Sequence, residues 1–192
     1  MSTPSDWSPD GGVIAFSPDV PDGVAIPVWT LVIASGESTA ALAHPEKSLF
    51  QAHFAPDGRW ITFNATSGAG QTRSEVFIAP YRKGRQTPES EWIAVTDGWG
   101  WDDKPRWSPD GNIVYFTSDR DGFRCIWMQR LDPQAKRPVG DPTALYHFHS
   151  ARRSPMNLGL GGLEMSVTRD KIVLNLGEQT GNIWLAELEE RY

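Results

Sequence analysis

Three short apolar runs along the chain each follow a polar turn of similar composition. The runs IAF, WITF and IVYF are continuous rather than alternating, which is typical of strands covered on both faces. Turn and run together form three segments: WSPDGGVIAF at 7–16, FAPDGRWITF at 54–63 and WSPDGNIVYF at 107–116. Each segment therefore predicts the end of one strand, a tight turn and a second strand.

The segment recurs at intervals of similar length. A weaker fourth copy, VTRDKIVLNL at 167–176, keeps the acid and the apolar run without the proline and glycine. The acid recurs at intervals of 47, 53 and 60 residues, at Asp10, Asp57, Asp110 and Asp170. Periods of this size indicate supersecondary units in an array, and propeller blades of about 40–50 residues fit best.

Two further anchors complete each repeat. The first is an apolar pair with an aromatic residue, found at Val28-Trp29, Val76-Phe77, Ile126-Trp127 and Ile183-Trp184. The second is a further strand-like segment, found at 39–43, 91–96 and 143–148. The unit predicted is a meander of four antiparallel strands.

The turn residues have a structural explanation. Proline presets φ at the first central position, the aspartate side chain can bond nearby backbone N–H groups, and glycine accepts a positive φ at the exit. The repeated acids are therefore expected to shape turns, and no catalytic residue is predicted among them.

The stretch WSPDGNIVYFTSDRDGFRCIW at 107–127 resembles the WD40-like β-propeller repeat of TolB and of many bacterial proteins. Prolyl oligopeptidase-type peptidases carry similar repeats. The resemblance implies an all-β chain of four TolB-type blades in a single domain over 1–192. The expected blades span approximately 4–48, 49–101, 102–160 and 161–192. Such a chain could be part of a larger propeller, half of a two-chain ring, or a compact four-bladed monomer.

Composition narrows the classes of partner. Nine Trp and eight Phe supply a core, and the formal net charge of −6 without a basic run argues against nucleic acid and anionic membrane surfaces. No apolar stretch approaches the length of a membrane span, so no membrane insertion is expected. The start, MSTPSDWSPD, enters the first repeat at once and leaves no room for a signal peptide. A soluble chain is expected, either cytoplasmic or a fragment of a longer, exported protein.

The residues that could carry chemistry do not form a familiar motif. The sequence contains no G-x-S-x-G elbow, no H-E-x-x-H and no Walker loop. Cys125 is interpreted as a buried small hydrophobe. His147 and His149 alternate and could share a metal with His53 or Asp102, but nothing in the sequence brings these residues together. Neither a metal site nor a cofactor is predicted.

An interaction surface is the better hypothesis, because tryptophan and arginine are favoured binding anchors and long loops carry function. The candidates for contact with a protein or peptide partner are Trp99, Trp101, Asp102, Lys104, Arg152 and Arg153. The alternative is that the two tryptophans tuck between blades. The predicted function is a non-catalytic scaffold that binds a partner on its loop-rich face. The alternative is the substrate-gating or accessory propeller of a prolyl oligopeptidase-like hydrolase whose catalytic domain is absent from this chain.

The terminal repeats predict an open edge. If the blades do not close on themselves, the outer faces of repeats one and four stay bare, and self-association is expected. The residues exposed would be Val13, Ile14, Phe16 and Trp29 in repeat one, and Ile172, Val173, Leu174 and Trp184 in repeat four.

Overall fold

The computed structural model describes residues 2–67, 72–150, 152–159, 161–181 and 185–186. Apart from two short 3-10 helices, η1 (Glu89–Glu91) and η2 (Pro155–Asn157), its regular elements are β-strands. No helix in the described ranges is long and apolar enough to span a membrane. The chain is thus all-β, as predicted.

Three sheets contain four strands each, and their spatial order follows the order along the chain. The first holds β1 (Thr3–Trp7), β2 (Val13–Ser17), β3 (Val28–Val32) and β4 (Ser38–Leu42). The second holds β5 (Ser48–Phe54), β6 (Trp60–Ser67), β7 (Arg73–Pro80) and β8 (Ile93–Ala94). The third holds β9 (Asp103–Trp107), β10 (Ile113–Ser118), β11 (Cys125–Arg130) and β12 (Thr143–Tyr146). All pairs are antiparallel, so the predicted four-stranded meander is confirmed three times.

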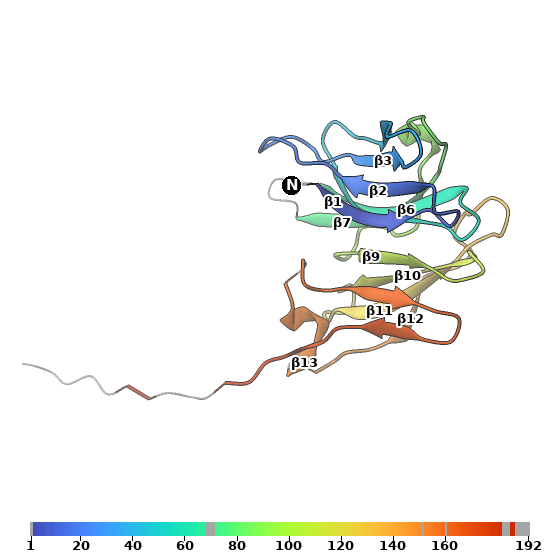
Figure 1. Cartoon of the computed structure of the whole chain (residues 1–192). Helices are drawn as coiled ribbons and strands as arrows, with labels where there is room; N and C mark the ends of the chain where they lie inside the picture. The colour runs from blue at the N-terminus through green and yellow to red at the C-terminus, as the bar shows by residue number, and fades with distance from the viewer. Residues whose placement is uncertain (1, 68–71, 151, 160, 182–184, 187–192) are drawn as a thin grey trace, which may run out of the picture.

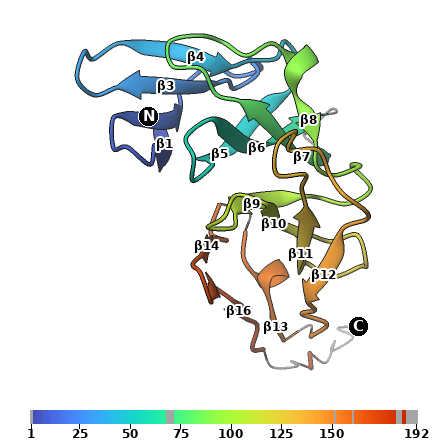
Figure 2. The ribbon, with the colours of Figure 1, turned by 90° about the vertical axis from the view of Figure 1, so that its right-hand side faces the viewer.

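The sheets follow one another around an arc, with the C-terminal strands beside the third sheet (Figures 1 and 2). These strands form two pairs: β14 (Met165–Val167) with β15 (Ile172–Leu174), and β13 (Arg153–Ser154) with β16 (Gly177–Glu178). The weaker fourth repeat therefore supplies a two-stranded hairpin. The predicted third strand of that repeat, at Ile183-Trp184, lies outside the described residues, and a complete fourth blade stays a prediction.

The repeated turns have the predicted chemistry. In the first repeat the Asp10 carboxylate accepts hydrogen bonds from the Ser8 hydroxyl at 2.6 Å and the Gly12 N–H at 3.0 Å. In the third repeat Asp110 accepts the equivalent bonds from Ser108 and Asn112 at 2.5 and 3.1 Å. The glycine at each turn exit has a positive φ, 72° at Gly11 and 70° at Gly111. The turn is thus set by local residues and is the same in the first and third copies.

Burial differs between the sheets in a way that the apolar runs did not predict. In the middle sheet, β6 is buried on both faces, because the first and third sheets pack against it. In the first sheet, Val13 and Ala15 are buried, whereas Ile14 and Phe16 on the opposite face of β2 are only half-buried. Continuous apolar runs therefore indicated two covered faces correctly for WITF and incorrectly for the first repeat, which has a neighbouring sheet on one side only.

The N-terminal segment also differs from its local propensity. Residues of MSTPSD have little β preference, yet Thr3–Trp7 forms β1 and pairs with β2 from Thr3↔Ser17 to Trp7↔Ile14. The turn at 8–11 reverses the chain onto β2, so pairing overrides propensity. The segment thereby forms the first strand, at one edge, of the first sheet.

Candidate functional site

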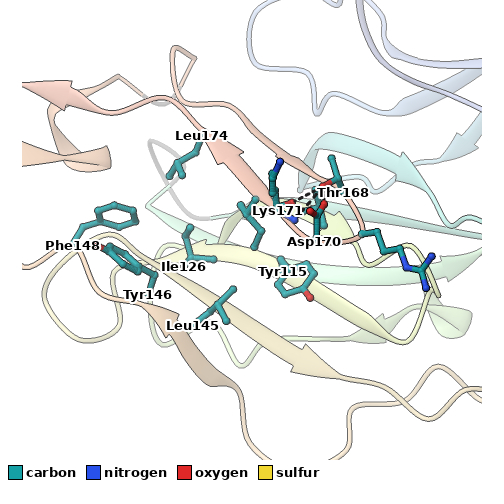
Figure 3. Close-up of a pocket in the computed structure, with 12 residues that line it drawn as sticks. Tyr115, Ile126, Leu145, Tyr146, Phe148, Thr168, Asp170, Lys171 and Leu174 are labelled. Carbon is teal, nitrogen blue, oxygen red and sulfur yellow. Dashed lines mark hydrogen bonds between the residues drawn. The ribbon is translucent and has the colours of Figure 1, made fainter.

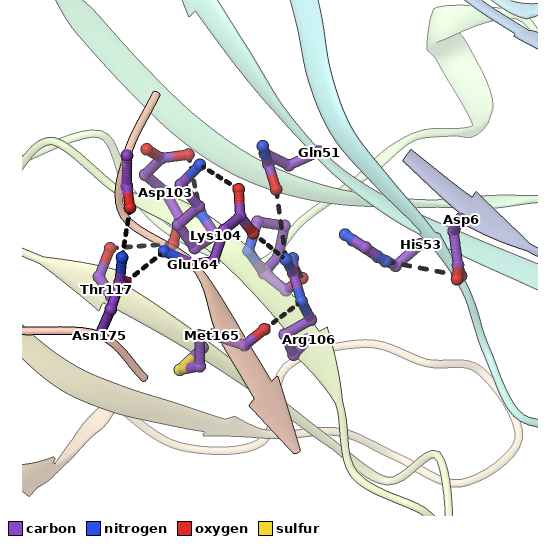
Figure 4. Close-up of polar contacts among 12 residues, drawn as sticks. Asp6, Gln51, His53, Asp103, Lys104, Arg106, Thr117, Glu164, Met165 and Asn175 are labelled. Atoms are coloured by element: carbon purple, nitrogen blue, oxygen red, sulfur yellow. Dashed lines mark hydrogen bonds and ion pairs between the residues drawn. The ribbon is translucent and has the colours of Figure 1, made fainter. Parts of the chain in front are cut away.

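A polar network joins the first strands of successive sheets. Strand β1 contacts β5, β5 contacts β9, and β9 contacts β14. Near the centre of this arrangement, Arg106 on β9 donates to the Met165 carbonyl at 2.7 Å and to the Glu164 carboxylate at 3.0 Å (Figure 4). The same carboxylate accepts a bond from Lys104 Nζ at 3.2 Å. The network therefore ties the third sheet to the C-terminal hairpin.

His53 extends the network toward the first sheet. Its Nδ1 lies 3.5 Å from an oxygen of Asp6 on β1 (Figure 4). Burial lowers the pKa of His53, and the nearby Arg106 acts in the same direction, while the hydrogen bond to Asp6 opposes it. Burial also lowers the pKa of Arg106. The Lys104 and Arg106 cations are paired with the Glu164 carboxylate, as charges removed from water must be, so the network is a structural tie between sheets.

A second polar cluster holds the loop that carries the predicted tryptophans. Arg120, in the β10–β11 hairpin, reaches Asp102 at 3.2 and 3.3 Å and Asp97 at 3.4 Å. The guanidinium also lies over the rings of Phe116 and Trp127, at 5.6 and 5.2 Å from their centroids. Burial raises the pKa of Asp102, although hydrogen bonds from Ser118 and Thr96 and the charge of Arg120 oppose the rise. Arg120 therefore fixes both ends of the segment 97–102.

The same segment is attached through its backbone. The Trp101 N–H donates to Asp119 at 2.6 Å, and the Asp102 N–H donates to the Ser74 carbonyl at 3.1 Å. An added Cβ at Gly100 would lie 2.8 Å from the Ser118 hydroxyl, so only glycine fits against the hairpin here. The loop is consequently a rigid platform.

This packing leaves some of the predicted partner-binding residues exposed and buries others. Trp99 is 87% exposed at the tip of the loop, while Trp101 is partly buried. Asp102 and Lys104 are buried, at 0% and 2% exposure, so they hold the structure together and present nothing to a partner directly. The prediction of surface contacts therefore loses these two residues, because their charges are used in ion pairs with Arg120 and Glu164.

The two predicted arginines lie on exposed surface. Arg152 and Arg153 both approach the Glu178 carboxylate, at 2.9 and 3.3 Å, with 72% and 66% of their side chains exposed. Together with the segments 147–150 they border a hollow of about 740 Å³. Because both side chains are largely exposed and such exposed ion pairs are weak, both guanidinium groups remain accessible.

These parts form one surface, called here the loop face and made of residues 97–102, 119–124, 147–150 and 152–153. The 97–102 loop bonds to the 119–124 hairpin through Asp119 and Arg120. The hairpin in turn bonds to the 147–150 segment through Asp121. Trp99 and the two arginines thus lie on a continuous strip at one end of the sheets.

The histidine pair is placed differently from the expectation. His147 Nδ1 lies 2.9 Å and His149 Nε2 lies 3.1 Å from the same oxygen of Asp121. Neither expected third ligand is present, because His53 pairs with Asp6 and Asp102 pairs with Arg120. The signal that could have found Asp121 is topological: the β10–β11 hairpin and the end of β12 lie at the same end of one meander.

An apolar pocket of about 580 Å³ was also missed by sequence reasoning. It lies between the third sheet and the β14–β15 hairpin (Figure 3). Its apolar lining includes Tyr115, Ile126, Leu145, Tyr146, Phe148 and Leu174. The pocket exists because the C-terminal hairpin covers only part of the third sheet. The pocket lies between repeats three and four and is lined by residues of both, so it is distinct from the bare outer face expected for repeat four.

Comparisons with known proteins agree with the architecture. No protein-family model matches the chain. An uncharacterized protein of Agrobacterium fabrum, Atu1656, is 28% identical over 134 residues, which cover 70% of this chain and 42% of that protein. A protein described as TolB from Agrobacterium tumefaciens has a TM-score of 0.57 and 25% identity, covering 76% of this chain and 49% of that one. TolB from Acinetobacter baumannii has a TM-score of 0.60 and 18% identity, covering 93% and 41%.

Propeller domains of peptidases share the fold as well. The β-propeller domain of the Trilobed protease from Pyrococcus furiosus has a TM-score of 0.53 and 14% identity, covering 91% of this chain and 48% of that one. The structural neighbours are thus TolB proteins and propeller domains, and the resemblance to TolB-type propellers is confirmed. The chain spans less than half the length of each of these relatives.

Proposed function

We propose that this chain is a non-catalytic propeller scaffold that binds a protein or peptide on its loop face. The observation that supports the proposal most is Trp99, a large aromatic side chain at 87% exposure on a loop fixed by Arg120. The loop backbone that carries Trp99 is held in place, and a tryptophan side chain buries a large apolar area on binding.

The two arginines supply a second contact. Arg152 and Arg153 lie at the other end of the loop face, beside the hollow of about 740 Å³. Their shared partner, Glu178, is itself on the surface, so an incoming carboxylate can replace it with little loss. The partner expected is a segment with an apolar group for Trp99 and an acidic group for the arginines.

The test replaces the anchor and compares it with an exposed tryptophan at the other end of the sheets. Trp99→Ala is paired with Trp7→Ala, because Trp7 is 57% exposed and stands at a β1–β2 turn, away from the loop face. Both variants and the wild type select from a peptide display library. We expect the wild type and Trp7→Ala to enrich the same peptides and Trp99→Ala to lose them; equal enrichment by all three would overturn the proposal.

The second candidate function is an accessory propeller for a prolyl oligopeptidase-like hydrolase. The likeness to the propeller domain of the Trilobed protease favours it at the level of fold alone. Both candidates require that this chain hydrolyse nothing by itself, which is consistent with the lack of a G-x-S-x-G elbow. Turnover of peptide or ester substrates that follows the protein through successive purification steps would contradict the non-catalytic proposal.

A further inference from the structure

Four side chains with metal-binding atoms converge where the third sheet meets the loop face. Asp121 comes from the β10–β11 hairpin, Cys125 begins β11, and His147 and His149 follow β12. One ligand atom from each lies within 4.8 Å of the other three. Among the described residues this is the group of His, Cys, Asp and Glu side chains that is gathered closely enough to hold a metal ion.

The distances among the two ring nitrogens and the carboxylate oxygen are close to those of a tetrahedral site. Zinc binds imidazole nitrogen at about 2.0–2.1 Å and thiolate sulfur at about 2.3 Å, so neighbouring ligand atoms stand roughly 3.3–3.8 Å apart. Here the two ring nitrogens are 3.2 Å apart, and they lie 2.9 and 3.1 Å from the Asp121 oxygen. For these three atoms an expansion of a few tenths of an ångström would accommodate the ion. The Cys125 sulfur lies within 4.8 Å of them and would move closer by up to about 1 Å through side-chain rotation.

Hydrogen bonding alone explains the arrangement less well. If both imidazoles donate to Asp121, two N–H groups face each other across the 3.2 Å between His147 and His149. If one ring donates to the other, a ring nitrogen is left without a proton for the carboxylate. A cation at the common point satisfies the lone pairs of both rings and of the carboxylate at once.

Neighbouring groups hold the ligands in place. The Phe148 N–H donates to the Cys125 sulfur at 3.3 Å, and the Phe123 N–H donates to the other oxygen of Asp121 at 3.3 Å. The His149 ring packs on Phe123, with centroids 4.7 Å apart, and the His147 ring packs edge-on to Trp127 at 6.2 Å. Such outer contacts orient the first ligands of a metal site.

We propose that Asp121, Cys125, His147 and His149 bind one zinc ion. A sulfur and two imidazoles favour a borderline-soft transition metal over calcium or magnesium, which prefer oxygen ligands. Four protein ligands leave no open position, which is typical of structural sites. On binding, the Cys125 thiol releases its proton to solvent and the thiolate bonds to the metal. The ion would fasten the 147–150 segment to the third sheet.

The experiment titrates the chelator-treated, full-length chain with Zn²⁺ and with Co²⁺, which reports its ligands spectroscopically. We expect one equivalent of metal, an intense visible spectrum typical of tetrahedral Co²⁺, and a near-ultraviolet sulfur-to-cobalt charge-transfer band. Cys125→Ser should remove that band. His147→Ala, His149→Ala and Asp121→Asn should each weaken Zn²⁺ binding by at least about 10–100-fold, the loss caused even by outer-sphere changes.

His44→Gln is the matched control, since it removes a histidine that bonds elsewhere, to Glu89. It should bind Zn²⁺ like the wild type. Should the wild type bind less than one equivalent, or show octahedral Co²⁺ without the sulfur band, the site would be refuted. Binding that survives in Cys125→Ser with an unchanged spectrum would likewise reduce the feature to a surface His-x-His pair. Circular dichroism of each metal-free variant separates loss of ligand from loss of fold.

Discussion

Replacing Arg120 with alanine tests the structural basis of the loop face most directly. The side chain is 13% exposed and pairs with Asp102, whose side chain is fully buried. The substitution leaves the Asp102 carboxylate in the interior without its cation. It also removes the guanidinium from the rings of Phe116 and Trp127.

The expected loss of unfolding free energy follows from the two ways in which the variant can respond to the lost cation. Removing one partner of a buried ion pair costs about 3–5 kcal/mol when the remaining charge stays ionised. Asp102 can instead take up a proton, which costs an ordinary aspartate about 4 kcal/mol at pH 7 and about 1.5 kcal/mol at pH 5. The cheaper response sets the limit, so we expect a loss of about 3–4 kcal/mol at pH 7.

The pKa of Asp102 determines how the cost of Arg120→Ala depends on pH. The pKa of Asp102 is already raised by burial, and losing Arg120 raises it further. A raised pKa in the folded state means that the folded variant binds a proton that the unfolded chain releases, so acid stabilises the variant relative to the wild type. The cost of Arg120→Ala should therefore fall by about 2 kcal/mol between pH 7 and pH 5.

The assay is equilibrium urea denaturation at both pH values, followed by tryptophan fluorescence. Arg82→Ala is the control, because Arg82 forms an ion pair of 2.6 Å with Glu91 on exposed surface. That pair should contribute little to stability, because both side chains are open to solvent. If Arg120→Ala costs no more than Arg82→Ala, or costs the same at both pH values, the account of Asp102 as a buried carboxylate held by Arg120 is wrong.

Two further outcomes follow from burial. The pKa of His53 is lowered in the folded state, so unfolding takes up a proton below about pH 6.5. The wild-type unfolding free energy should therefore fall as the pH decreases from there, by at most about 1.4 kcal/mol per pH unit. His53→Gln should flatten this slope in urea melts at several pH values. Phe63→Ala should lower the unfolding free energy by about 3–5 kcal/mol, since Phe63 is fully buried between Phe77 and Trp92. Val173→Ala, at a 60% exposed site, should change it by less than about 0.5 kcal/mol. Similar costs for both variants would contradict the assigned core.

The repeat and its turns could be derived from the sequence because they depend on residues close together in the chain. Asp10, Gly11 and Ser8 form their turn among themselves, and Asp110 does the same with Ser108 a hundred residues later. Local hydrogen bonds and allowed φ angles determine such turns. The order of strands in each meander follows from short connections for the same reason.

The use made of individual side chains was decided only by the tertiary structure. Asp102 and Lys104 stand in a polar loop in the sequence, yet both are buried, because Arg120 and Glu164 arrive from other parts of the chain to pair with them. Burial of a charge depends on whether such a partner is available nearby in space, and sequence distance does not report that.

The convergence of the metal ligands and the half-buried face of the first sheet also depend on contacts between distant parts of the chain. His147 and His149 were visible as a pair, but Asp121 reaches them from 26 and 28 residues away through the pairing of β11 with β12. The runs IAF and WITF are both apolar, yet only the second lies between two sheets. The sequence by itself therefore determined the unit and its local geometry. The contacts between units depend on which surfaces meet in space, and they determined burial, ion pairing and the convergence of ligands.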